Sequence, residues 1–154
     1  MLPALSDLLD YQHPKVIQTY VRTFQVDESE AIALFQEMLT FLWISTKHTL
    51  DRQAQPNNKQ LQFQFVMHQE MRPIDDMWHN FILYTRDYIQ FCDRYFGTYI
   101  HHEPDIAIDK IPTEAEFTTN MAKYLEYVYE HLGELTLRRW FANHFTSTEQ
   151  PHAA

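Results

Sequence analysis

The clearest structural signal lies in residues 74–96, IDDMWHNFILYTRDYIQFCDRYF. Bulky apolar side chains recur there in alternating steps of four and three residues, which is the spacing of one face of an α-helix. They are Met77, Phe81, Tyr84, Tyr88, Phe91 and Tyr95. A second apolar row lies beside the first, so about half of the helical circumference is apolar. Gly97 follows, where a left-handed cap favours glycine. The pattern predicts one long, largely buried helix.

Helical signals extend over most of the remaining chain. The segments are 4–12, 14–25, the run after Asp27, the run after Thr113, and 135–145. Asp27 is a suitable N-cap, with acidic residues in the first turn behind it. Thr113 and Glu116 have the spacing of a capping box. Gly133 is placed to close that helix, as Gly97 closes the one before it.

One segment departs from this pattern. Residues 61–68 alternate apolar side chains with glutamines, which is typical of a strand, but no partner strand is evident. An extended segment and a helix continuation fit equally well. We therefore expect an all-α fold, an irregular bundle of five to six helices with at most one short extended segment near 61–68. A single helical domain over 1–146 with a frayed tail over 147–154 suits this length.

The composition excludes several functional classes. The chain has two glycines, where average usage gives about 11 in 154 residues. Neither is placed for a dinucleotide fingerprint or a P-loop, and the G-x-S-x-G nucleophile elbow is absent. The net charge of −9 argues against nucleic acid as a partner and favours a basic protein.

The cysteine content and the N-terminal sequence indicate a cytoplasmic protein. Cys92 is the single cysteine, so no internal disulfide and no cysteine-based zinc site can form. Its place in the apolar row suggests a small buried hydrophobic residue. The N-terminus has no basic region typical of a signal peptide, and no apolar run approaches 18 residues. No membrane association is expected.

A polar edge runs along the predicted long helix. Asp75 and His79 are four residues apart, so they share a helix face. Arg86 falls on the same edge of the apolar arc. His101 and His102 follow shortly after the helix ends. A connection that folds back would bring one of them close to His79.

This region also carries a recognisable motif. The residues concerned are Asp75, Trp78, His79, Phe81, Ile82, Leu83, Thr85, Tyr88, Phe91, Cys92, Phe96, Gly97, Ile100, His101, His102 and Pro104. They resemble an uncharacterised bacterial family that reads D-x-x-W-H-x-F-I-L, then F-C, then F-G-x-x-I-H-H-x-P. The D-x-x-W-H element is distantly similar to one in the N-terminal domain of plant glycine-rich-domain-containing proteins. The resemblance implies no established reaction, and it indicates where a site would lie.

Two interpretations of the polar residues remain open. In one, Asp75, His79, His101 and His102 bind a transition metal, zinc or iron, because imidazoles and a carboxylate suit such ions. In the other, Asp75 orients His79 and helps to cap the helix, while the two later histidines anchor the connection. Convergence of the imidazole nitrogens to within about 4 Å would favour the metal.

No complete catalytic set can be assembled, so whether the protein is an enzyme stays open. We expect a small acidic cytoplasmic protein that acts as a non-catalytic protein-interaction module, with a basic protein as partner. Trp78 and Arg86 are its candidate partner or pocket residues. The alternative is a metal-binding protein or metal-dependent enzyme using the four residues above. A third possibility is a small-molecule binder with an aromatic-lined pocket. Self-association into a homo-oligomer is left open.

Overall fold

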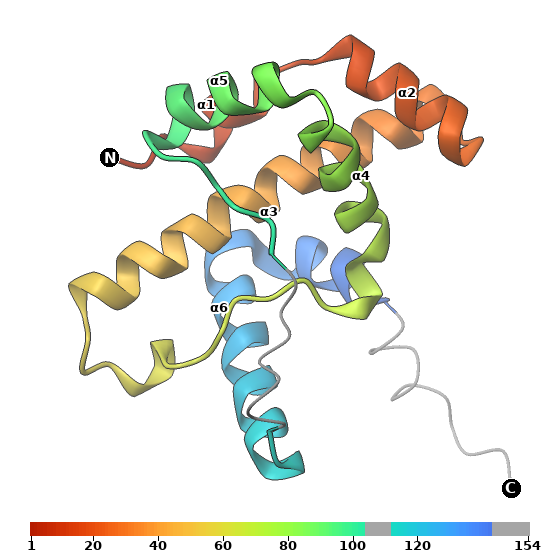
Figure 1. Ribbon diagram of the computed structural model, residues 1–154. Helices are drawn as coiled ribbons and strands as arrows, with labels where there is room; N and C mark the ends of the chain where they lie inside the picture. Colours follow the sequence, from red (N-terminus) through yellow and green to blue (C-terminus); the bar gives the residue numbers. More distant parts are fainter. Residues whose placement is uncertain (104–111, 143–154) are drawn as a thin grey trace, which may run out of the picture. The chain divides into compact units, whose positions relative to one another are not determined.

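The computed structural model describes residues 1–103 and 112–142, and all regular structure in these residues is helical (Figure 1). The α-helices are α1 (Leu5–Leu9), α2 (Pro14–Phe24), α3 (Glu28–Ala54), α4 (Arg72–Ile82), α5 (Thr85–Phe96) and α6 (Glu114–Trp140). Two short 3₁₀ turns, Lys59–Leu61 and Gln69–Met71, lie between α3 and α4. The described ranges contain no strand, so the prediction of an all-α irregular bundle is confirmed.

The described residues fall into two compact units. Unit 1 contains Met1–Lys47 and Arg72–Glu103, and unit 2 contains His48–Met71 together with the described part of Pro104–Ala154. The boundary at Lys47 falls inside α3, which therefore contributes residues to both units. The single domain expected over 1–146 stays a prediction, and the expected tail over 147–154 lies outside the described residues.

The α2 helix of unit 1 begins with a histidine cap. His13 accepts the amide hydrogen of Val16 at its Nδ1 atom, at 3.2 Å, and Pro14 occupies the first helical position. Because Nδ1 is an acceptor, the ring proton sits on Nε2, which lies 2.7 Å from the Asp87 carboxylate of α5. This histidine thus caps one helix and attaches it to another.

The prediction of one long helix over 74–96 is wrong in one respect. The structure has two helices there, α4 and α5, with a break between them (Figure 1). Leu83 at the break is 79% exposed, and Tyr84 has non-helical dihedral angles. The Tyr84 hydroxyl donates to the Lys15 carbonyl of α2, which holds the corner. The apolar spacing stays helical on both sides of the corner, so periodicity alone could not reveal it.

A cluster of aromatic rings holds α4 within unit 1. Phe81 of α4 is fully buried. Its ring lies 5.7 Å from Phe35 of α3, 5.2 Å from Tyr88 and Phe91 of α5, and 6.0 Å from Tyr11. These separations are typical of favourable aromatic pairs. The cluster fixes the helix from which the candidate site projects.

The segment 61–68 in unit 2 explains its alternating pattern without forming a strand. The odd positions Leu61 and Phe63 are buried, whereas Gln62 and Gln64 are exposed. Phe65 stacks on Tyr124 of α6, with ring centroids 4.4 Å apart. The Tyr124 hydroxyl also donates to the Val66 carbonyl. The alternation of apolar and polar residues therefore reflects burial of one side of the segment, which packs on helix α6 and not on a second strand.

Both glycines have the positive φ expected of them. Gly97 ends α5 at φ 68°, and Gly133 has φ 84° within α6. At Gly133 the helix is kinked and then continues to Trp140, and residues 143–145 of the last helix predicted over 135–145 lie outside the described residues. The predicted capping box of Thr113 and Glu116 is confirmed, with both hydrogen bonds present.

No described helix combines the length and the apolar character that a membrane crossing requires.

His48 of unit 2 makes stability depend on pH. It is almost fully buried, its Nε2–H donates to the Leu61 carbonyl, and burial lowers its pKa below the ordinary 6.5. The unfolded chain takes up a proton below that value while folded His48 resists it. Stability from this residue is therefore complete above pH 6.5 and is lost as the pH falls through the folded pKa. In urea unfolding at about pH 7.5 and 5.5, His48→Gln should lose less stability on acidification than the unsubstituted protein.

The exposed His101 provides the control for this prediction. His101→Gln should retain the full acid sensitivity, because it replaces a histidine on the surface and leaves the buried His48 in place. Equal acid sensitivity in His48→Gln and the unsubstituted protein would contradict the assignment to His48.

Candidate metal centre

The first two residues of the site come from consecutive turns of α4. Asp75 lies in the first turn, and His79 follows one turn later on the same face. The His79 Nδ1 atom lies 3.8 Å from the Asp75 carboxylate, which is an ion-pair distance and too long for a hydrogen bond. The His79 side chain is 56% exposed and that of Asp75 is 25% exposed, so the pair opens to solvent.

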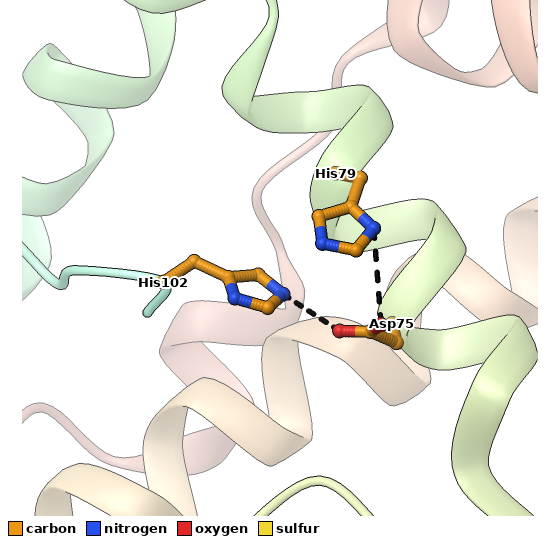
Figure 2. Close-up of side chains that lie close together, drawn as sticks. All are labelled: Asp75, His79 and His102. Carbon is orange, nitrogen blue, oxygen red and sulfur yellow. Dashed lines mark hydrogen bonds and ion pairs between the residues drawn. The ribbon is translucent and has the colours of Figure 1, made fainter. Parts of the chain in front are cut away.

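The third residue arrives on the segment that follows α5. Gly97 ends that helix in a left-handed conformation, and the segment 98–103 that follows reaches α4 through His102. His102 places its Nε2 atom 2.6 Å from the Asp75 carboxylate (Figure 2). Its ring stacks on that of His79, with centroids 4.3 Å apart and planes at 19°. It also packs on the indole of Trp78 at 4.0 Å.

These contacts bring three metal-ligating groups together. One ligand atom from each of Asp75, His79 and His102 lies within 4.8 Å of the other two. Ligand atoms around one tetrahedral zinc ion, at about 2.0–2.1 Å from it, are about 3.4 Å apart. Closing the group onto an ion therefore requires movements on the order of 1 Å. His79, whose side chain is 56% exposed, would lose the least packing of the three if it made this movement.

The other residues singled out from the sequence lie elsewhere. His101 is exposed, and its ring packs on Tyr99 at 4.7 Å instead of joining the cluster. Arg86 is exposed on α5, beyond the break that separates it from Asp75 and His79. Trp78 is buried and lies under His102, so it serves as a packing surface.

Tyr88 is a site residue that the sequence did not reveal. Its hydroxyl accepts a hydrogen bond from Trp78 Nε1 at 3.0 Å and donates one to the Ile100 carbonyl at 2.6 Å. Burial raises the pKa of this phenol above its ordinary value, so the hydroxyl keeps its proton and remains a donor near neutral pH. In the sequence, Tyr88 looks like one more aromatic residue of the apolar helix face. Two signals point to it in the sequence: its place in the family motif, and a hydroxyl at a position of the apolar face.

Cys92 is buried, as predicted, and contributes no nucleophile. Burial raises the pKa of its thiol, although the Ile100 amide and the Tyr88 hydroxyl beside the sulfur act in the opposite direction. A thiol in this setting stays protonated near neutral pH, and a reactive cysteine needs the thiolate. The chemistry available here is that of the carboxylate and the imidazoles.

A separate cavity lies in unit 2. Its volume is about 480 Å³, and apolar residues such as Phe63, Met121 and Tyr124 line it together with Arg52. None of the three clustered residues of unit 1 contributes to its lining. The small-molecule interpretation therefore concerns a different place from the polar cluster.

Comparison with known proteins gives a family. A family model described as UCP032817-like matches residues 57–140, more than half of the chain. The matched range includes Asp75, His79 and His102. The family is uncharacterised, as the sequence motif led us to expect. Neither the curated proteins nor the solved structures yielded a match.

Proposed function

We propose that this chain, which belongs to the UCP032817-like family, binds a first-row transition metal ion through Asp75, His79 and His102. The observation that supports the proposal is the convergence of three ligand groups within 4.8 Å, although His102 lies 27 residues beyond Asp75. One carboxylate with two imidazoles is a ligand set used by zinc and by non-haem iron.

The exposure of the group supports binding with open coordination positions. His102 is 17% exposed and forms the inner side of the cluster, whereas His79 is 56% exposed. An ion held by three protein ligands on this surface keeps its remaining positions toward solvent. Water or an external ligand can occupy those positions, as in catalytic metal sites, whereas structural zinc sites are closed by four protein ligands.

The position of His79 favours metal binding over a purely structural role. The 98–103 segment is already attached by two hydrogen bonds, from His102 to Asp75 and from Tyr88 to the Ile100 carbonyl. His79 makes no hydrogen bond to Asp75, and its imidazole lies parallel to that of His102 at 4.3 Å. Anchoring does not require this second imidazole, whereas a metal site does.

Metal titration tests the proposal. The protein without a histidine tag, stripped with a chelator, should bind one Zn²⁺ or Co²⁺ ion per chain by calorimetry. His79→Ala should weaken that binding about 100-fold, because removing one ligand costs roughly 3 kcal/mol of the 10–16 kcal/mol typical of a four-ligand zinc site.

The neighbouring histidine supplies a matched control. His101→Ala removes an equally accessible imidazole that lies outside the cluster, so it should bind metal like the unsubstituted protein. Equal affinities in His79→Ala and His101→Ala would contradict the proposal, as would the absence of stoichiometric binding.

The protein-interaction module stays a prediction from composition, with the net charge of −9 as the reason to expect a basic partner. The cytoplasmic location and the distant similarity to plant glycine-rich-domain-containing proteins also stay predictions from the sequence. Partner recovery that is unchanged in His79→Ala would separate such an activity from metal binding.

A further inference from the structure

The Tyr88 hydroxyl joins the two elements that hold His102. On one side it accepts the indole hydrogen of Trp78, whose ring lies against the His102 imidazole. On the other side it donates to the carbonyl of Ile100, two residues before His102. Tyr88 is fully buried, so solvent cannot replace either hydrogen bond without entering the core.

Ile100 is attached to α5 through its carbonyl, which accepts from the Tyr88 hydroxyl at 2.6 Å. Its amide also acts on the buried Cys92 thiol, where it opposes the rise in pKa that burial causes. Both partners are buried on α5. The backbone is therefore fixed to the helix immediately before His102, whose Nε2 atom lies 2.6 Å from Asp75.

We propose that Tyr88 is a positioning residue that sets the metal affinity of the Asp75–His79–His102 site by fixing His102. This inference rests on the proposed function. Tyr88 does not touch the ion. It holds the peptide before His102 and the indole beneath it, so that the imidazole does not have to be ordered when the ion binds. Partners that orient metal-ligating histidines typically contribute about 10- to 100-fold to metal affinity.

If Tyr88 positions His102, metal binding and the order of residues 98–103 should each strengthen the other. Tyr88 favours the conformation in which His102 faces Asp75, and an ion bound to both residues favours the same conformation. Metal binding should then slow amide hydrogen exchange in residues 98–103, since two effects that favour one state reinforce each other. In Tyr88→Phe, exchange in the metal-free segment should be faster than in the unsubstituted protein.

Tyr124→Phe provides the matched comparison. Tyr124 is also buried and its hydroxyl also donates to a backbone carbonyl, that of Val66, but it belongs to unit 2. Tyr88→Phe should weaken Co²⁺ and Zn²⁺ binding about 10-fold or more and alter the Co²⁺ absorption spectrum. Tyr124→Phe loses the same kind of hydrogen bond and should leave affinity and spectrum unchanged.

The outcomes separate this inference from the proposed function. If the unsubstituted protein binds Co²⁺ and Tyr88→Phe binds it within about twofold, with the same spectrum, the positioning role is overturned and the metal site stands. If the unsubstituted protein binds no metal, both fall. Should Tyr88→Phe fail to fold, Trp78→Phe retains a ring beneath His102 and removes the indole N–H. Unchanged affinity in that variant would overturn the part of the role that runs through the indole.

Discussion

Replacing His102 with alanine is expected to weaken binding of Zn²⁺ or Co²⁺ by about 100-fold or more. His102 is the least exposed of the three proposed ligands, so its loss removes the inner side of the cluster. It also removes the hydrogen bond to Asp75 that attaches residues 98–103 to α4. Hydrogen bonds to charged groups contribute about 1.5–3 kcal/mol, so the metal-free variant should also be less stable.

A second substitution separates these two effects of His102. The side-chain amide of His102→Gln can still donate to Asp75, but it is a poor ligand for zinc. This variant should keep the segment attached, as shown by near-normal hydrogen exchange in residues 98–103, and still lose metal affinity. Metal affinity in His102→Gln equal to that of the unsubstituted protein would show that His102 acts only as an anchor.

Phe81→Ala is expected to cause the largest loss of stability, about 3–5 kcal/mol. The ring is fully buried at the centre of the unit 1 cluster, and it contacts aromatic residues from α3 and α5. Alanine removes the transfer free energy of the ring and leaves a cavity that rigid aromatic neighbours fill poorly. Urea unfolding followed by circular dichroism measures the effect.

An exposed phenylalanine gives the reference for this measurement. Phe117 lies on the exposed first turns of α6, and Phe117→Ala should change stability by about 0.5 kcal/mol or less. A loss below about 1 kcal/mol in Phe81→Ala would contradict the central place given to this ring.

Helix starts and ends were predictable because local chemistry determines them. Asp27 accepts the Glu30 amide, Thr113 forms its capping box, and Gly97 has positive φ, all as residue type and spacing indicate. The corner at Leu83 and Tyr84 was not predictable, since it depends on a contact between Tyr84 and α2. Alternation over 61–68 reported burial correctly, but it could not distinguish a strand from a coil packed on a helix.

The candidate site was predictable in composition and not in detail. Helical spacing placed Asp75 and His79 together, and the short connection suggested that one of two adjacent histidines returns. Which of them does so depends on the backbone path after Gly97, which residue types do not specify. The structure brings back His102 and leaves His101 on Tyr99. Tyr88 was missed because its function requires the hydroxyl partners, and these come from Trp78 and Ile100.

The order of the chain through its two units limits how the protein can be shortened. Unit 1 is assembled from two stretches of sequence, Met1–Lys47 and Arg72–Glu103, with part of unit 2 between them. The family match over 57–140 contains all three proposed ligands but omits Tyr11 and Phe35, whose rings pack near Phe81. A recombinant fragment restricted to that range would carry the ligands without the aromatic core that supports their helix. During synthesis, likewise, the ligand-bearing unit cannot be completed before residue 103 has been made.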